Sequence, residues 1–266
     1  MKILIFGLPG SGKTYLAELL SAYFGNKAKW FNADKVRDEA NDWDFSDEGR
    51  LRQSKRMFDL CEEAESHYDI VIADFIAPFE VAREQFDADY EVFMDTIDAG
   101  RYEDTNKIFE KPANADYIVT DQRGDIDAKI IAYDIGQKFL WDNQAPTTQM
   151  LGRFQPWHHG HQILFERALD KHGQVNVMIR DMPHDNMKNP YVAPLVKENL
   201  IQHLHNYAGQ VKIDIVPNIM NITYGRDVGY KIEQEHLGEE IESISATEIR
   251  RAEHIRQQQD PRHNQE

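Results

Sequence analysis

Residues 3–14 read Ile3-Leu4-Ile5-Phe6-Gly7-Leu8-Pro9-Gly10-Ser11-Gly12-Lys13-Thr14, and this stretch largely determines what the first half of the chain can become. Its apolar start predicts a buried strand, and the apolar spacing over residues 13–23 predicts a helix. Glycines between the two let backbone N–H groups turn inward around phosphate oxygens, while the helix presents its positive N-terminal end to the same anion. The spacing Gly-x-x-x-x-Gly-Lys-Thr therefore predicts a P-loop that binds the phosphates of ATP.

The residue types in this loop predict separate roles. Lys13 adds a point charge at the β- and γ-phosphates, and Thr14 supplies a hydroxyl to Mg²⁺. The remaining ATP contacts are expected from Gly7, Gly10, Ser11 and Gly12.

Strand-like runs alternate with helical patterns along the whole chain, which is typical of parallel sheets with crossover helices. The first half shows strands at 3–6, 28–31, 69–74, 91–95 and 117–120, and helices at 13–23, 49–67 and 126–140. The second half shows strands at 148–151, 175–180 and 211–216, and helices at 161–171 and 193–207. We predict an α/β protein with two doubly wound parallel-sheet domains, at 1–142 and 150–256, a polar linker at 143–149 and a polar tail at 257–266.

Composition narrows the class of protein. The chain has 266 residues, 41% hydrophobic and 29% charged, which suits two ordinary globular domains. No apolar run approaches the about 20 residues that span a bilayer, and Met1 and Lys2 lead directly into the first strand. We therefore expect a cytoplasmic protein without a signal peptide or a membrane partner. Cys61 is the only cysteine, which excludes disulfides within the chain and cysteine-based zinc sites.

The net charge of −16 is divided unevenly between the halves. Residues 1–142 hold 17 Lys and Arg against 30 Asp and Glu, and residues 143–266 hold 13 against 16. So acidic a surface repels a polyphosphate backbone, which argues against a nucleic-acid partner. Small nucleotides and anionic acceptors are the expected partners, each held by local cations and backbone N–H groups, and the sequence leaves a homo-oligomer open.

Several short motifs follow the loop, namely Asn32-Ala33-Asp34-Lys35-Val36-Arg37, Asn41, Phe45-Ser46, Arg50, Phe75-Ile76-Ala77-Pro78 and Met94-Asp95-Thr96. They occur in the order found in adenylylsulfate kinases, and most of residues 1–120 resembles that family. The resemblance implies a P-loop kinase fold in which Asp34, Arg37 and Arg50 orient an acceptor nucleotide, with Asn41, Phe45 and Ile76 in the same acceptor site. It also implies phosphoryl transfer from ATP to a ribose hydroxyl, which depends mainly on positioning and charge neutralisation.

The chain departs from this family on the acceptor side. The family's long lid, with its Lys-Gly-Leu-Tyr-Lys-Lys-Ala-Arg run, is replaced by the short segment 100–107. Ala77 stands where the family has a serine, and Glu80 stands where it has an arginine. These departures leave the kinase class intact and the identity of the acceptor open, including a different small anionic molecule.

Other polar residues in the first half have two readings each. Asp74, at a strand end, is predicted to be either a second-sphere Mg²⁺ ligand or a cap of the next turn. Residues 42–44 are predicted to form a solvated loop rather than a metal site. Arg52, Lys55 and Arg56 are expected on a surface helix face, paired with nearby carboxylates.

A second phosphate motif lies past the middle, at Gly152-Arg153-Phe154-Gln155-Pro156-Trp157-His158-His159-Gly160-His161. Its His-x-Gly-His pattern is similar to that of the nucleotidylyltransferases, and their Ile-Ser-x-Thr-x-Ile-Arg signature matches Ile244-Ser245-Ala246-Thr247-Glu248-Ile249-Arg250. The resemblance implies a Rossmann-like fold and binding of a nucleoside triphosphate. His158 and His161 would then donate hydrogen bonds to charge developing at the α-phosphate. Nucleotide contacts are expected from Gly152, Arg153, Phe154, Gly160, Ser245, Thr247 and Arg250, and Arg250 is expected to be catalytic together with the two histidines.

Alternatives remain for this second half. A zinc site on His158, His159 and His161 is disfavoured, because consecutive histidines on a glycine-broken turn lack the usual spacing. The segment 224–230, with Arg226 and Asp227, is expected to bind base and ribose, with a plain turn as the alternative. Arg180-Asp181 and Lys188-Asn189-Pro190 are weaker candidates for acceptor contacts. The opening resembles nicotinamide-mononucleotide adenylyltransferases and the small size resembles glycerol-3-phosphate cytidylyltransferase, so ATP and CTP both remain open as substrates.

Our leading hypothesis is a bifunctional Mg²⁺-dependent enzyme, a kinase followed by a nucleotidylyltransferase. A rival is nicotinamide salvage, in which the kinase phosphorylates a nicotinamide riboside and the transferase makes the dinucleotide. In a third hypothesis the kinase half has lost catalysis and serves as a nucleotide-binding regulatory module, an idea motivated by the missing lid.

Overall fold

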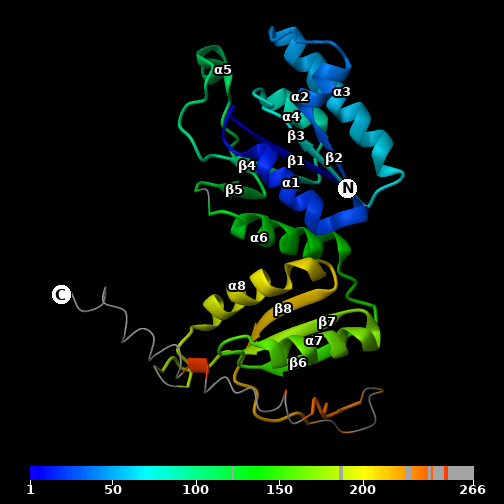
Figure 1. The fold of residues 1–266 in the computed structure, drawn as a ribbon, viewed down its shortest axis with the longest axis vertical. Coiled ribbons are helices and arrows are strands. Elements are labelled where there is room, and N and C mark those ends of the chain that lie inside the picture. Colours follow the sequence, from blue (N-terminus) through cyan, green and yellow to red (C-terminus); the bar gives the residue numbers. More distant parts are fainter. Residues whose placement is uncertain are drawn as a thin grey trace, which may run out of the picture. The chain divides into compact units, whose positions relative to one another are not determined.

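The computed structural model describes residues 1–121, 123–185, 188–223, 225, 229, 231–238, 241, 249 and 250. It divides into two compact units, Met1–Ile135 and Gly136–Glu266, each with its own sheet (Figure 1). The division falls inside the predicted helix 126–140, where α6 (Ile126–Ile135) ends and the π-helical turn η2 (Gly136–Leu140) follows. A Cβ added to Gly136 would lie 2.4 Å from the Gly209 nitrogen, and this close packing joins η2 to the second unit.

The first unit contains a five-stranded parallel sheet in the order β2-β3-β1-β4-β5 (Figure 1). The strands are β1 (Lys2–Gly7), β2 (Ala28–Asn32), β3 (Ile70–Asp74), β4 (Tyr90–Met94) and β5 (Tyr117–Val119). The helices besides α6 are α1 (Lys13–Phe24), α2 (Ala33–Glu39), α3 (Asp47–Glu65), α4 (Glu80–Phe86) and α5 (Glu103–Ile108), with the 3₁₀ turn η1 (Gly25–Lys27).

Helices cover both faces of this sheet. The step from β1 to β2 runs in one direction across the sheet, and the later steps run back in the other, so right-handed connections place α1 opposite α2, α3 and α4. Consistent with this, α1 packs against α6, whereas α3 packs against α4. Alternate residues of β1 enter different cores, with Leu4 and Phe6 joining Met57 and Phe86 beneath α3 and α4. The doubly wound arrangement predicted for the first domain is therefore confirmed.

The second unit contains a three-stranded parallel sheet in the order β6-β7-β8 (Figure 1). The strands are β6 (Thr148–Gly152), β7 (Val175–Arg180) and β8 (Val211–Val216), connected by α7 (His159–His172), α8 (Ala193–Leu204) and the 3₁₀ turn η3 (His205–Tyr207). Thus α7 begins two residues earlier than the predicted helix 161–171, and the predicted helix 193–207 is split between α8 and η3.

Only one face of this second sheet is covered by the helices of the described segments. Both connections step in the same direction, which places α7 and α8 on one face, and the rings of Phe165 and Tyr207 meet there at 4.9 Å. Along β7, alternate residues such as Val177 are buried, while Asn176 and Met178 are half-exposed. The described residues thus form one βαβαβ unit and do not confirm a doubly wound second domain.

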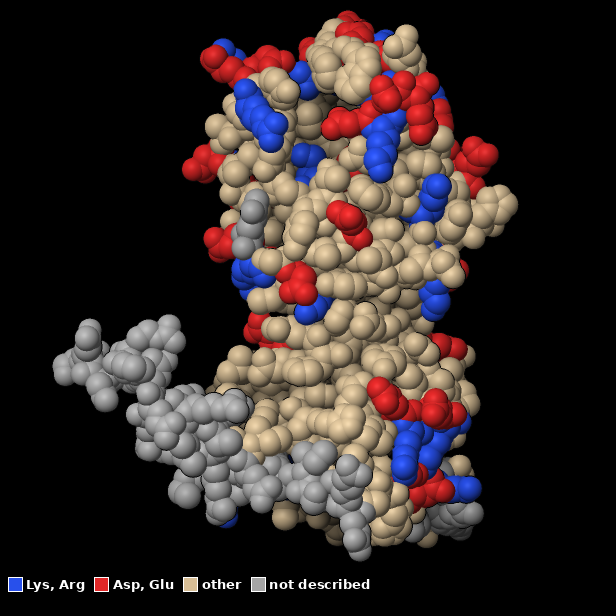
Figure 2. Space-filling model, viewed as in Figure 1, with Lys and Arg blue, Asp and Glu red and all other residues tan. Residues whose placement is uncertain are grey.

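None of the helices in the described part of the chain has the length and apolar character needed to cross a membrane. On the face drawn in Figure 2, acidic side chains lie among basic ones, and the coloured residues show no continuous basic stripe.

Candidate functional site

The P-loop corner is the turn where β1 ends and α1 begins. Its backbone shape requires glycine. Gly7 has a φ of +147°, and a Cβ there would lie 2.6 Å from the Met94 carbonyl oxygen. Gly10 and Gly12 also have positive φ values, of 93° and 96°. Helix α1 starts after Gly12 with no side chain capping its first N–H groups. These backbone donors are therefore available to an anion, as the sequence predicts.

Lys13 lies buried at the start of α1. Its Nζ donates to the Leu8 carbonyl oxygen at 2.8 Å. Burial lowers the pKa of Lys13 to about 8, opposed by the negative charges of Asp74 and Asp34. A cation removed from water in this way gains most from an incoming phosphate, which replaces the lost hydration with charge.

Thr14 and Asp74 form the centre of a polar network at the carboxyl ends of three strands. The Thr14 hydroxyl donates to Asp74 Oδ2 at 2.7 Å, and the Trp30 indole N–H donates to Oδ1 at 2.7 Å. The Asn32 amide donates to both oxygens, at 3.1 and 3.0 Å. Asp74 is 2% exposed, and burial raises its pKa while these donors oppose the shift. A strand-end aspartate held by three side chains is oriented toward the P-loop.

Register explains why these residues meet. Asn32 on β2 is opposite Asp74 on β3, and Asp74 is opposite Ile5 on β1. Trp30 lies two residues before Asn32 and so shares its face of the sheet. Sequence reasoning missed Trp30 and Asn32 as partners of Asp74, although their spacing of two along one strand was the signal available.

The donor set near Thr14 suits Mg²⁺ only together with phosphate oxygens. The described residues contain no group of three or more histidine, cysteine or acidic side chains that could hold a metal alone. Mg²⁺ commonly uses one or two carboxylates or hydroxyls with substrate phosphates and water. The Thr14 hydroxyl and the buried Asp74 carboxylate, 2.7 Å apart, fit that pattern.

A cavity of about 310 Å³ adjoins the start of α1. Its lining combines Gly12, Tyr15 and Leu16 with residues after β5, namely Asp121, Arg123, Gly124 and Asp127. Asp127 accepts hydrogen bonds from the Tyr117 hydroxyl, at 2.9 Å, and from Arg123. Sequence reasoning missed this segment, although its polar residues directly follow a strand at the edge where ligands of such sheets bind.

On the predicted acceptor side, the structure brings Arg37, Phe45 and Arg50 together. The guanidinium carbons of Arg37 and Arg50 lie 4.9 and 6.0 Å from the centre of the Phe45 ring, which is 51% exposed. Both arginines are buried, and burial lowers the pKa of Arg37. Of the other predicted acceptor residues, Asp34 and Asn41 are exposed and Ile76 is half-buried after β3.

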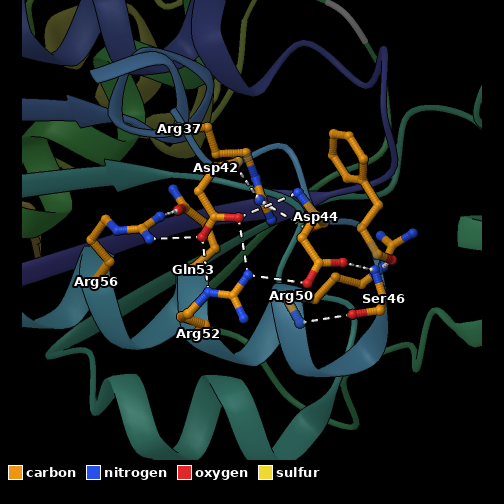
Figure 3. Close-up of polar contacts among 10 residues, drawn as sticks. Arg37, Asp42, Asp44, Ser46, Arg50, Arg52, Gln53 and Arg56 are labelled. Atoms are coloured by element: carbon orange, nitrogen blue, oxygen red, sulfur yellow. Dashed lines mark hydrogen bonds and ion pairs between the residues drawn. The ribbon is translucent and has the colours of Figure 1, made fainter. Parts of the chain in front are cut away.

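Residues 42–44 are fixed by ion pairs (Figure 3). Arg52 donates to both oxygens of Asp42, at 2.9 and 3.0 Å, and to Asp44 at 3.1 Å, while Arg56 donates to Asp42 at 2.8 Å. Hydrogen bonds from Arg52 and Arg56 hold the pKa of Asp42 well below its usual range. The expected pairing of this helix face with carboxylates is seen, and it orders the loop that carries Phe45.

The second candidate site is the histidine corner, the turn where β6 ends and α7 begins. The rings of His158 and His161 stack with centroids 3.7 Å apart, and each has a buried Nδ1 without a hydrogen-bond partner. Burial and the neighbouring His158 lower the pKa of His161 to about 4, and burial lowers that of His158. Helix α7 begins after His158 with no side-chain cap. Two neutral imidazoles and an uncapped helix start therefore share one corner.

Aromatic and amide contacts support this corner. The rings of Phe154 and Trp157 lie 5.1 and 5.4 Å from that of His161. The Gln155 amide exchanges hydrogen bonds with the Tyr191 backbone, at 2.6 and 3.0 Å, and the Gln155 carbonyl oxygen accepts one from Arg250. A Cβ on Gly152 would lie 2.7 Å from the Phe154 ring, and one on Gly160 would lie 3.2 Å from the His158 ring.

Four predicted contacts of the second half lie outside the described residues, namely Arg226, Asp227, Ser245 and Thr247. Arg153 is exposed, and its Nη1 donates to the Asn189 side chain at 3.4 Å, so the structure does bring the first motif to the loop at 188–190.

Comparison with known proteins supports the kinase-like character of the first unit. The family model for adenylylsulphate kinase matches residues 1–119. The first unit is an adenylylsulfate kinase-like P-loop kinase domain. Comparison with curated proteins finds no match. The family match ends at residue 119, before the second unit begins at Gly136.

Solved structures similar to the chain include further kinases. A mutant APS kinase of Mycobacterium tuberculosis is 25% identical, with 49% of this chain and 92% of that chain covered and a TM-score of 0.41. The hexameric APS kinase of Thiobacillus denitrificans is 20% identical, with 52% and 29% covered and a TM-score of 0.43. Shikimate kinase of Acinetobacter baumannii is 19% identical, with 52% and 94% covered and a TM-score of 0.37.

Proposed function

We propose that the first unit transfers the γ-phosphoryl group of ATP to a hydroxyl of a small nucleotide-like acceptor. The observation that carries the proposal is the buried Lys13 beside the Thr14–Asp74 hydrogen bond, at the end of a glycine loop that leaves its N–H groups uncapped. The chemistry is an in-line displacement. The acceptor oxygen bonds to the γ-phosphorus, the bond to the bridging oxygen breaks, and ADP leaves.

Each residue of this corner has a role that follows from its contacts. Backbone N–H groups of the loop and Lys13 bind the β- and γ-phosphates, and the cavity between α1 and the segment after β5 accepts the base. Thr14 and Asp74 would hold Mg²⁺, which would neutralise charge on the transferred group. Asp34, exposed at the start of α2 and close enough to influence the pKa of Lys13, would accept the proton of the acceptor hydroxyl.

The test of the kinase proposal is Lys13→Ala in the intact protein. We expect loss of ATP-dependent phosphorylation with every acceptor, while the second unit keeps its activity. The exposed Lys55, paired with Asp59 on α3, offers the control Lys55→Ala, which should keep full activity. Equal loss in both variants would refute the assignment.

For the second unit we propose nucleotidyl transfer from ATP or CTP to an anionic acceptor. An acceptor oxygen bonds to the α-phosphorus and pyrophosphate leaves. The proposal is supported by the stacked pair His158 and His161, whose unpartnered Nδ1 atoms lie beside the uncapped start of α7. Neutral imidazoles there can donate hydrogen bonds to oxygens of the α-phosphate as charge develops.

Pyrophosphate release tests this second proposal. His161→Ala should abolish it, whereas His159→Ala should not, because His159 is exposed and lies outside the stacked pair. Supplying ATP or CTP with nicotinamide mononucleotide or glycerol 3-phosphate identifies the substrates, and NAD formation would select the nicotinamide salvage alternative. No pyrophosphate from any pair would refute nucleotidyl transfer.

A further inference from the structure

Arg50, which is predicted to orient the acceptor nucleotide, already forms hydrogen bonds within the protein. Its Nε donates to the Phe45 carbonyl oxygen at 2.8 Å. Its Nη2 donates to Asp104 Oδ2 at 3.0 Å and to the Thr105 hydroxyl at 3.2 Å. Arginine recognises phosphate or sulfate best through two parallel N–H donors on one edge of the guanidinium. Both such edges of Arg50 include Nη2, whose two hydrogens are taken.

The contact with α5 is built into the fold. Thr105 is 2% exposed, so the helix is anchored by a buried side chain. The turn before α5 is closed by Asn106, which exchanges hydrogen bonds with the Gly100 backbone at 2.8 and 3.1 Å. A Cβ on Gly100 would lie 2.9 Å from Pro9, so the same turn packs on the P-loop. The short segment at 100–107 thus holds the backbone of Asp104 next to the ATP site, and its side chain, which is 69% exposed, pairs there with Arg50.

Charge strengthens the effect of this contact. Arg37 uses both Nη1 hydrogens on the carbonyl oxygens of Asp42 and Asp44, at 2.9 and 3.1 Å, which leaves its Nε–Nη2 edge for a two-donor contact with an acceptor. Residues 1–142 carry a net charge of −13, from 17 basic and 30 acidic residues. An acceptor with a phosphate or sulfate at the Arg50 end would meet a cation already paired with Asp104, in a part of the chain whose net charge is negative.

We propose that Asp104 is a specificity-determining residue that takes the place of an acceptor's anionic group on Arg50, so that the kinase selects an uncharged, nucleoside-like alcohol. This inference rests on the proposed kinase function. The exposed face of Phe45 remains available to pack against the flat part of such an acceptor.

Equilibrium binding to the intact protein, with Mg²⁺ and a non-hydrolysable ATP analogue present, tests the proposal. Adenylylsulfate is the anionic probe and adenosine is the uncharged one. Wild type should bind adenosine more tightly. Asp104→Asn should tighten binding of adenylylsulfate by at least about tenfold and leave adenosine within about twofold. Glu103→Gln is the matched control, because Glu103 lies on the same turn of α5 but pairs with Lys107. Glu103→Gln should leave the affinities for adenylylsulfate and adenosine unchanged.

Adding Arg50→Ala to Asp104→Asn should cancel the gain for adenylylsulfate, and circular dichroism checks that each variant is folded. Three results would overturn the proposal: tighter binding of adenylylsulfate than adenosine by wild type, no gain in Asp104→Asn, or no binding of either probe by any variant. Measuring ATP turnover distinguishes a failure of the proposed role of Asp104 from a failure of the proposed kinase function. A gain in anion binding without phosphorylation of any acceptor would refute the kinase function and leave the role of Asp104 standing.

Discussion

The P-loop corner and the histidine corner share a backbone plan but differ in charge. Each lies where a parallel strand ends and a helix begins without a side-chain cap. The first adds Lys13, whose pKa of about 8 keeps it charged at neutral pH, and the second adds His161, whose pKa of about 4 keeps it neutral. The same N–H donors can therefore be combined either with a fixed cation or with uncharged hydrogen-bond donors.

The largest difference between the corners should come from their glycines. Gly7→Ala places a Cβ 2.6 Å from a backbone oxygen at a φ of +147°, and we expect it to lower the free energy of unfolding by about 3 kcal/mol or more. Gly152→Ala meets the buried Phe154 ring, a side chain rather than backbone, and should lower the free energy of unfolding by about 2 kcal/mol. Denaturant unfolding measures both. Gly25→Ala, at a φ of +54° with open space, isolates the backbone strain. Equal losses at Gly7 and Gly25 would contradict a steric cause.

Asp74→Asn should produce the second-largest difference between the two corners, because the histidine corner has no equivalent carboxylate among its described contacts. Removing the charge that orients Thr14 should lower ATP turnover by about a hundredfold without affecting pyrophosphate release. Steady-state kinetics measures this. Asp59→Asn, an exposed aspartate paired with Lys55, is the control. Turnover within about threefold of wild type would exclude Asp74 from the site.

The pH dependence should separate the corners further. Phosphate binding favours the ammonium form of Lys13, so ATP affinity should be highest below pH 8 and fall as pH rises above it, by up to about tenfold per pH unit. His161 is neutral throughout this range, so nucleotide binding at the second corner should not change between about pH 7 and 9. Calorimetry with Lys13→Ala and His161→Ala assigns each binding event. A fall at the second corner of similar size would contradict the difference in charge.

The smallest expected effect is that of Trp30→Phe. It removes one donor to Asp74 but leaves those from Thr14 and Asn32, so the free energy of unfolding should drop by about 1 kcal/mol. Thermal unfolding without nucleotide measures it. Trp43→Phe, on a tryptophan that is 49% exposed, should have almost no effect. Similar shifts in both variants would mean that the indole hydrogen bond contributes little.

Local patterns predicted the P-loop, the parallel sheets and the kinase-like motifs, because each depends on neighbours in sequence. Contacts between distant residues were not predictable in the same way. Arg50 meets Asp104 across 54 positions, and Asp74 meets Thr14 across 60. The segment after β5 was missed because its role depends on where α1 lies. The end of α6 at Ile135 depends on Gly136 packing against Gly209, which no periodicity shows.

The uncapped starts of α1 and α7 have a consequence for how long the folded chain survives. No side chain of the protein satisfies these N–H groups, so a ligand that binds them adds stability to the folded unit in proportion to the logarithm of its concentration. Resistance to heat and proteases would then rise with the supply of nucleotide.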